Sequence, residues 1–297
     1  MATSNPPSIY RNAAAKAALM ELYDAKQASL RIPDLQERDI DTPLGRTHVL
    51  IAGPASAPPV LLLHGIHAGA PLAMEAMAPL TDRFRVYAVD TIGQATKSAE
   101  NRPPLNDSSL GQWLAATMDG LGLQTAAVIG VSYGGFLLLR LIAHAPERVA
   151  KAIFVVPGGL VNGKSGPSMR KLFWPLMLFQ MTKKDKHLRR FMEAFYKDLD
   201  AHHLQFQRLI LTGVKMDYRK PPLAQAAEVA AFQAPVYAMV AEDDIFFPGP
   251  EAAARCKEIF PNFKESHILK GAKHIPSLSD YPQIAQKLGQ WLESCPS

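Results

Sequence analysis

Hydrophobic and polar positions change their spacing several times along this chain, and each spacing predicts a different element. Near the start, apolar residues at helical spacing predict an amphipathic helix over residues 9–30. Two short extended segments, residues 35–41 and 46–53, are joined by Thr-Pro-Leu-Gly and predict a β-hairpin. The continuous apolar run at residues 60–63 is typical of a strand buried on both faces of a parallel sheet.

Strand-like and helical segments then alternate over the rest of the chain, apart from one long interruption. Further strands are predicted at residues 85–90, 126–131, 151–159, 234–244 and 264–274, and helices at residues 108–123, 133–146, 249–260 and 281–294. This alternation predicts an α/β protein, with a mostly parallel central sheet of about eight strands flanked by helices on both faces.

Residues 160–230 form the interruption, because strand-like runs give way there to helical sequence rich in basic and aromatic residues. We expect this segment to be a helical cap insertion that lies over the carboxyl edge of the sheet. The predicted organisation is therefore a helical extension at residues 1–34, a core made of residues 35–159 and 231–297, and a cap at residues 160–230.

Composition supports a globular protein and excludes several other classes. Of the 297 residues, 48% are hydrophobic and 20% are charged, as expected for one large domain with a sizeable core. A net charge of +5, without basic runs interleaved with aromatic residues, gives no reason to expect a nucleic-acid partner. Cys256 and Cys295 are expected to be free thiols in a reducing compartment. Since no signal-like segment or membrane-spanning run is present, we expect a cytoplasmic protein without an integral membrane segment.

One short motif carries candidate chemistry: Gly-Val-Ser-Tyr-Gly at residues 130–134, between a predicted strand and a predicted helix. It fits G-x-S-x-G, the nucleophile elbow, in which the serine hydroxyl stands clear of a sharp turn. Glycine at Gly130 and Gly134 would remove side chains that collide in such a turn. The N–H groups of the helix that begins after Ser132 would favour negative charge there. A glycine-rich turn that merely packs strand on helix is the structural alternative.

With this motif in this context, the chain resembles the α/β-hydrolase superfamily, and within it the capped, single-domain type that includes many bacterial esterases. The resemblance extends from about residue 35 to residue 293 and implies a serine, acid and histidine in that order along the chain. His274, between the last strand and the last helix, is then the expected base. Its context Gly-Ala-Lys-His is similar to the usual G-x-G-H, with lysine in place of the second glycine. His267 lies within a strand and is expected to be a surface or packing residue.

The resemblance also implies a carboxylate after the strand that follows the cap. Three acidic residues stand there, namely Glu242, Asp243 and Asp244. We choose Asp244, because family members commonly have a proline four residues after the aspartate, here Pro248. Asp243 stays open as an alternative, whereas Glu242 is expected to lie within the strand.

The same resemblance points to an oxyanion hole made of the backbone N–H groups of Ile66 and Tyr133. His67 would then lie near the mouth of the substrate pocket, as a lining residue. In the cap, Trp174 and Met177 are candidates for binding an acyl or aryl group, with packing inside the cap as the alternative.

Together these residues predict a serine hydrolase that cleaves carboxylic esters through an acyl-enzyme, with no metal or cofactor. The expected partner is a small-molecule ester, and the expected assembly is a monomer or homodimer. Serine rather than aspartate at position 132 argues against haloalkane dehalogenase and epoxide hydrolase chemistry. Thioesterase, lactonase, amidase and carbon–carbon bond hydrolase activities stay open, as does a non-catalytic small-molecule receptor.

Overall fold

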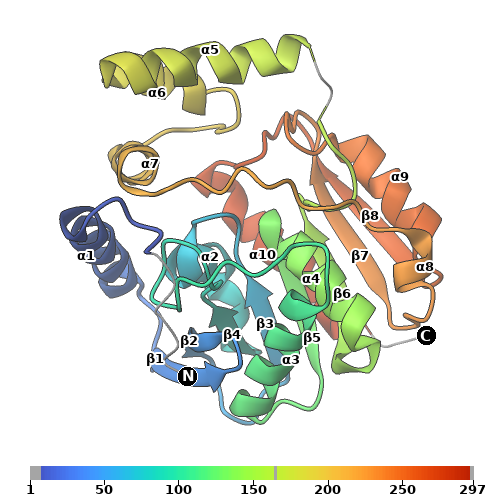
Figure 1. Ribbon diagram of the computed structural model, residues 1–297. Coiled ribbons are helices and arrows are strands. Elements are labelled where there is room, and N and C mark those ends of the chain that lie inside the picture. The colour runs from blue at the N-terminus through green and yellow to red at the C-terminus, as the bar shows by residue number, and fades with distance from the viewer. Residues whose placement is uncertain (1–7, 164–165, 295–297) are drawn as a thin grey trace.

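The computed structural model describes residues 8–163 and 166–294, in which eight strands form one sheet (Figure 1). The strands are β1 (Gln36–Thr42), β2 (Gly45–Ala52), β3 (Pro59–Leu63), β4 (Arg85–Val89), β5 (Ala126–Val131), β6 (Val149–Val155), β7 (Val236–Ala241) and β8 (Phe263–Leu269). Their order in the sheet is β1-β2-β4-β3-β5-β6-β7-β8. The pairs β4–β3, β3–β5, β5–β6, β6–β7 and β7–β8 are parallel. The pairs β1–β2 and β2–β4 are antiparallel. The predicted mostly parallel sheet is confirmed.

Two apolar layers, one on each face of the sheet, form the core. Consecutive strand residues point to opposite faces, so Val128 of β5 belongs to one layer and Ile129 to the other. The first layer is covered by α3 (Ser109–Leu121), α4 (Tyr133–His144), α8 (Ala226–Val229) and α9 (Gly249–Ile259), and the second by α2 (Gly69–Met77) and α10 (Tyr281–Glu293). Short 3₁₀ helices lie at Ala78–Asp82, Pro146–Arg148 and Leu278–Asp280. Burial on both faces explains why β3 reads as a continuous apolar run.

Three further helices lie beyond the carboxyl edge of the sheet (Figure 1). They are α5 (Pro167–Thr182), α6 (Asp185–Met192) and α7 (Ala201–Gly213). Phe179, Leu188 and Met192 are fully buried in an apolar cluster of their own. The cluster joins the core at Ile275, whose N–H donates to the carbonyl oxygen of Phe195 at 2.8 Å. This arrangement accords with a cap over the sheet edge, and the domain boundaries given above stay a prediction.

The N-terminal helix α1 (Ala13–Ser29) begins later than the expected residue 9. Asn12 has extended backbone angles, and its side chain accepts a hydrogen bond from the N–H of Ala15 at 2.8 Å, which caps the helix. Tyr10 precedes this cap and instead forms an isolated antiparallel bridge with Val214, just after α7. The start of the chain therefore ties α7 to α1.

Two predictions about the whole chain concern membrane spans and thiols. Within the described residues, no helix has both the length and the apolar character needed to cross a lipid bilayer. Cys256 is a buried free thiol, and burial raises its pKa, so it is unreactive as a nucleophile. Cys295 lies outside the described residues.

Candidate active site

A sharp turn between β5 and α4 places Ser132 at its tip. Ser132 has φ +52° and ψ −114°, a region that a residue with a side chain occupies only under strain. A Cβ atom on Gly130 would lie 2.6 Å from the carbonyl oxygen of Gly134, and one on Gly134 would lie 2.1 Å from that of Leu63. Both separations are far below van der Waals contact, so the turn requires glycine at both positions.

Backbone hydrogen bonds hold this strained turn in place. The N–H of Ser132 donates to the carbonyl oxygen of Val155 at 2.9 Å. The carbonyl oxygen of Ser132 accepts from the N–H groups of Gly135 at 2.9 Å and Gly158 at 2.8 Å. Because these bonds reach the end of β6 and the segment after it, the surrounding fold fixes the position of the serine.

His274 faces Ser132 from the loop between β8 and α10. The Oγ of Ser132 and the Nε2 of His274 are 2.9 Å apart. The imidazole is buried, and the rings of Phe246 and Phe247 lie edge-on to it, with centroid distances of 5.1 and 5.5 Å. These rings shield the base from water. An imidazole at this distance can take the hydroxyl proton as the serine oxygen attacks an electrophile.

Asp244 lies on the opposite side of the imidazole, just beyond the end of β7. Its Oδ2 is 2.7 Å from the Nδ1 of His274. Its Oδ1 accepts hydrogen bonds from the N–H groups of Phe246 at 2.8 Å and Phe247 at 3.0 Å. The carboxylate is thus fixed, and it selects the tautomer of His274 in which Nε2 can accept a proton from Ser132.

The other two candidate acids point elsewhere. Asp243 is exposed, and its backbone N–H donates to the carbonyl oxygen of Ala272 at 2.9 Å. Glu242 lies just outside β7, where its carboxylate accepts from the Nζ of Lys270 at 3.0 Å and the N–H of Gly271 at 2.9 Å. Of the three adjacent acids, Asp244 is the one in contact with His274.

The loop after β3 lies directly against the nucleophile. A Cβ atom on Gly65 would be 3.3 Å from the Cβ of Ser132 and 3.8 Å from its Oγ. His64 supports the loop: its Nε2 accepts from the N–H of Thr91 at 2.9 Å, so its proton is on Nδ1, 2.6 Å from the carbonyl oxygen of Gly65. Burial lowers the pKa of His64 and keeps it neutral. The loop is therefore rigid where an oxyanion-binding amide is expected.

A cavity of about 60 Å³ opens beside this loop. Ile66 and Tyr133, whose backbone N–H groups are the expected oxyanion donors, both line it, and so does His67. Three of the residues predicted around the nucleophile therefore meet at one cavity.

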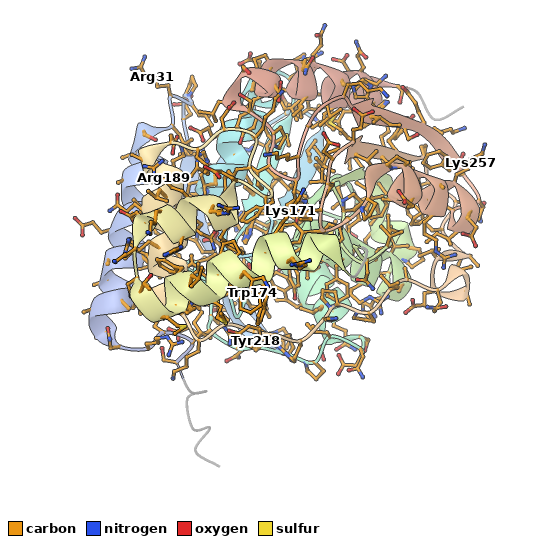
Figure 2. The ribbon with its side chains drawn as sticks, turned by 90° about the horizontal axis from the view of Figure 1, so that it is seen from above. Arg31, Lys171, Trp174, Arg189, Tyr218 and Lys257 are labelled. Carbon is orange, nitrogen blue, oxygen red and sulfur yellow. The ribbon has the colours of Figure 1, made fainter. Side chains whose placement is uncertain are left out.

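The two cap residues predicted to bind substrate do not line this cavity, and their role stays a prediction. Neither Trp174 nor Met177 is among the described residues that line the cavity. Trp174 lies on α5 (Figure 2) and is 52% exposed. Its ring is edge-on to that of Phe173, with centroids 5.6 Å apart. Met177 is partly buried one turn further along the same helix.

Comparison with known proteins agrees with this architecture. A family model described as the alpha/beta hydrolase fold matches residues 58–215, more than half of the chain. The chain belongs to this family. Among curated α/β hydrolases it is similar to "Carboxylesterase YbfK" of Bacillus subtilis (strain 168), with 26% identity over 285 residues that cover 92% of this chain and 94% of the relative. It is also similar to "Uncharacterized carboxylesterase nap" of the same organism, with 24% identity and 84% coverage of each chain.

Solved structures show the same fold over almost the whole chain. The crystal structure of naproxen esterase (carboxylesterase NP) from Bacillus subtilis has a TM-score of 0.82 at 22% identity, covering 95% of this chain and 100% of that one. Within residues 8–163 and 166–294 of this α/β hydrolase, no group of three or more His, Cys, Asp or Glu side chains is placed to hold a metal ion.

Three charged residues near the candidate site were not predicted. Arg102, from the loop after β4, and Asp217 and Arg219, from the segment after α7, all line the 60 Å³ cavity with His67. No motif marks them, because they come from parts of the sequence that only the folded α/β hydrolase brings together.

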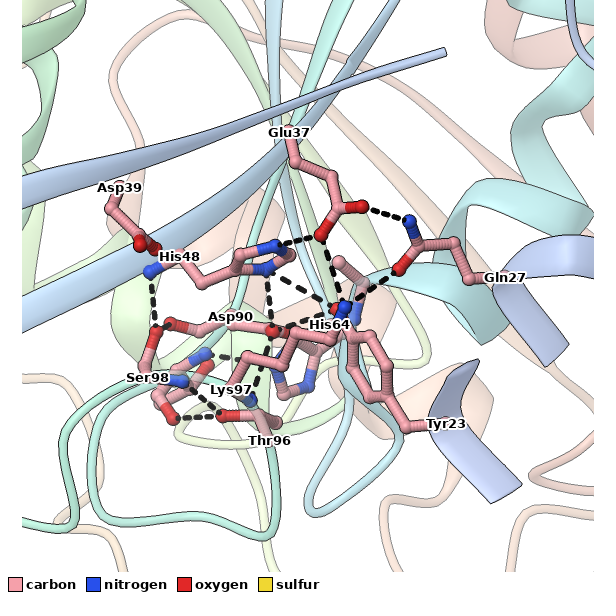
Figure 3. Close-up of polar contacts among 12 residues, drawn as sticks. Tyr23, Gln27, Glu37, Asp39, His48, His64, Asp90, Thr96, Lys97 and Ser98 are labelled. Carbon is pink, nitrogen blue, oxygen red and sulfur yellow. Dashed lines mark hydrogen bonds and ion pairs between the residues drawn. The ribbon is translucent and has the colours of Figure 1, made fainter. Parts of the chain in front are cut away.

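A second unpredicted feature, a largely buried polar network, connects α1 to the sheet (Figure 3). Asp90, at the end of β4, is fully buried and accepts hydrogen bonds from the hydroxyl of Tyr23 at 2.8 Å and the N–H of Ala70 at 2.7 Å. It also lies 3.0 Å from the Nδ1 of His48 on β2. Asp90 therefore joins α1, α2 and the sheet.

His48 is held between two carboxylates in this network. Its Nδ1 faces Asp90, and its Nε2 is 2.9 Å from Glu37. Burial alone would lower the pKa of His48, but its hydrogen bonds to Asp90 and Glu37 outweigh burial, and the pKa is raised. For Asp90 the signs are reversed: burial alone would raise the pKa of the carboxyl, but the hydrogen bond from His48 outweighs burial, and the pKa is lowered. A larger hollow of about 960 Å³ adjoins this network, and none of the triad residues lines it.

Proposed function

We propose that this α/β hydrolase is a serine hydrolase that cleaves carboxylic esters through an acyl-enzyme intermediate. The observation that carries the proposal is the 2.9 Å approach of Ser132 Oγ to His274 Nε2, with Asp244 fixed on the other side of the ring. Two relatives that align over most of the chain are named carboxylesterases, which favours an ester over the other bonds that such a triad can cleave.

In the first half of the reaction, Ser132 Oγ attacks the ester carbonyl carbon while His274 Nε2 takes the hydroxyl proton. Asp244 stabilises the resulting imidazolium through Nδ1. As the tetrahedral intermediate collapses, the bond to the alcohol oxygen breaks and His274 gives its proton to that oxygen. The alcohol leaves, and the acyl group stays on Ser132.

In the second half, water enters and His274 takes one of its protons as the water oxygen attacks the acyl carbon. Collapse of this second intermediate returns the proton to Ser132 Oγ and releases the carboxylic acid. In both intermediates the carbonyl oxygen carries negative charge, for which the backbone N–H groups of Ile66 and Tyr133 are the proposed donors. Each such donor is typically worth a factor of about 10²–10³ in rate.

Several features support this assignment of the oxyanion hole. Tyr133 begins α4, so its N–H belongs to a helix N-terminus, where partial positive charge favours an anion. Ile66 follows Gly65, whose close approach to Ser132 puts the loop at the reacting centre. A cytoplasmic location and a monomeric or homodimeric state accompany the proposal as expectations from the sequence.

The decisive test is hydrolysis of p-nitrophenyl acetate and butyrate by the purified protein and its Ser132→Ala variant. We expect nitrophenolate release by the parent protein and a loss of at least about 10⁴-fold in kcat for the variant. A fluorophosphonate probe should label the parent protein and leave the variant unlabelled. Hydrolysis that persists unchanged in Ser132→Ala would remove the proposed mechanism.

A further inference from the structure

The 60 Å³ cavity beside Tyr133 has one wall that the proposed mechanism does not use. Its lining includes apolar residues such as Ile92, Leu105 and Leu110, which suit a hydrocarbon chain. Against these stand two buried nitrogen atoms, His67 Nε2 and Arg102 Nη2, that have no hydrogen-bond partner among the described residues. A buried donor without an acceptor is unfavourable, typically by about 1–3 kcal/mol, so such a pair points to a ligand.

The protonation state of His67 follows from its other contacts. Its Nδ1 accepts a hydrogen bond from the N–H of Ala95 at 3.1 Å, so in the neutral ring the proton is on Nε2. Burial, with the nearby charge of Arg102, lowers the pKa of His67 to about 3. His67 is thus neutral at physiological pH and offers Nε2–H as a donor. The side chain of Gln94 accepts from the backbone N–H of His67 at 2.5 Å and holds this segment in place.

Arg102 adds a positive charge to the same wall. Its Nε donates to the carbonyl oxygen of Gly93 at 3.0 Å, which orients the guanidinium. Asp217 is engaged by a different arginine: Nε and Nη2 of Arg219 lie 2.9 and 2.6 Å from its two carboxylate oxygens. Since Asp217 and Arg219 balance each other, the cavity has a local excess of one positive charge.

We propose that this wall is a subsite for a carboxylate on the substrate, which accepts hydrogen bonds from His67 Nε2–H and from Arg102 Nη2. The inference rests on the proposed function and narrows it. Ile66 and Tyr133 line the same cavity and are the proposed donors to the scissile carbonyl. Ser132, Asp244 and His274 are not among the described residues that line it, so a group bound in the cavity would reach the reacting centre past Ile66 and Tyr133, and the small volume limits it to a short chain. The substrate class is esters that carry an acidic group a few carbon atoms away, such as half-esters of short dicarboxylic acids.

Two ethyl esters of similar size test this proposal: monoethyl succinate, which is anionic, and ethyl pentanoate, which is neutral. Acid release is followed by pH-stat titration, and the ratio of the two kcat/KM values is the readout. We expect the ratio to exceed about 10 for the parent protein, because hydrogen bonds to charged groups contribute on the order of tenfold to hundredfold. A ratio of one or below overturns the subsite.

Variants separate recognition of the charge from damage to the fold. Arg102→Met should lower the ratio by about tenfold or more, mainly through KM for the anionic ester. His67→Asn should lower it in the same direction: asparagine tolerates the left-handed φ of +56°, and its side-chain oxygen can replace Nδ1 as acceptor for Ala95. The matched control is Arg83→Met, which removes an exposed positive charge at the amino end of β4, away from the site, and should leave the ratio unchanged. An equal loss on both esters in Arg102→Met and His67→Asn would contradict the proposal.

A binding measurement on a variant that cannot turn over substrate tells failure of the carboxylate subsite apart from failure of the proposed esterase function. Calorimetry with Ser132→Ala should detect binding of monoethyl succinate, and the additional change Arg102→Met should weaken it by about tenfold or more. If neither ester is hydrolysed by the parent protein but this binding is found, the esterase proposal fails and the subsite stands. If ethyl pentanoate is hydrolysed through Ser132 and the binding is absent, the subsite alone fails.

Discussion

Replacement of Asp244 by asparagine tests the geometry of the site most sharply, because its neighbour Asp243 provides a matched control. Oδ1 of Asp244 accepts two backbone N–H groups, from Phe246 and Phe247, while Oδ2 faces His274. Asparagine has one acceptor oxygen, and the two N–H groups will hold it in the Oδ1 position. Its NH₂ group must then face Nδ1 of His274.

An NH₂ group at this position reverses the tautomer of His274. Nδ1 becomes the acceptor, the ring proton moves to Nε2, and Nε2 can no longer accept the proton of Ser132 at 2.9 Å. The equivalent change in serine proteases lowers kcat by about 10⁴-fold, which corresponds to about 5.5 kcal/mol of transition-state stabilisation. We expect a loss of this size for Asp244→Asn. The backbone contacts of the turn survive, so the melting temperature should change by no more than a few degrees.

Initial rates with p-nitrophenyl butyrate, corrected for spontaneous hydrolysis, measure this loss. Asp243→Asn removes the same charge one residue away, from an exposed side chain, and should keep activity within about twofold. If Asp244→Asn retains activity within tenfold of the parent protein, or if Asp243→Asn is the variant that loses it, the assignment of the acid is refuted.

Three further predictions concern stability. Gly134→Ala should destabilise the protein by about 3 kcal/mol or more, or prevent folding, because the new Cβ atom would lie 2.1 Å from the carbonyl oxygen of Leu63. Urea denaturation measures the free energy of unfolding, and a loss below about 1 kcal/mol would contradict the account of the turn. Tyr23→Phe should lower the free energy of unfolding by about 1–3 kcal/mol, because it removes a hydrogen bond to the buried carboxylate of Asp90. Urea denaturation measures this too, and an unchanged midpoint would show that the hydrogen bond does not stabilise the fold. The raised pKa of His48 means that its stabilising contribution is complete below its unfolded pKa of about 6.5 and is lost as pH rises through the higher folded value. The stability difference between parent protein and His48→Gln should therefore shrink from pH 6 to pH 9, and a difference that grows with pH would contradict this sign.

Local sequence was sufficient to predict the elements of the sheet and the turn at Ser132, because strand and helix periodicity and the glycine spacing depend on residues near in the chain. It failed where the chain departs from such patterns. Helix α2 was not predicted, since it begins at Gly69 with φ +77° and no capping side chain marks its start. The start of α1 was placed too early because apolar spacing continues through Ile9, whereas the cap at Asn12 decides the boundary.

Choices between neighbouring or distant side chains needed the folded chain. Asp243 and Asp244 are the same residue type at adjacent positions, and the backbone of the turn after β7 decides which carboxylate lies against His274. Trp174 was chosen for its residue type, and its exposure of about half depends on how α5 packs, which the sequence does not show; its role in binding stays a prediction. The contacts of Tyr23 with Asp90 and of His67 with Ala95 join residues from separate elements, so no spacing rule could indicate them.

The separation of 142 residues between Ser132 and His274 has a consequence for biosynthesis. The ribosome has synthesised strands β3 to β6 and the serine turn long before it reaches β8 and the loop after it. A nascent chain at that stage lacks His274, the proposed base for Ser132. In the proposed mechanism, Ser132 gains its base only once the loop after β8 has been made and β8 has paired with β7.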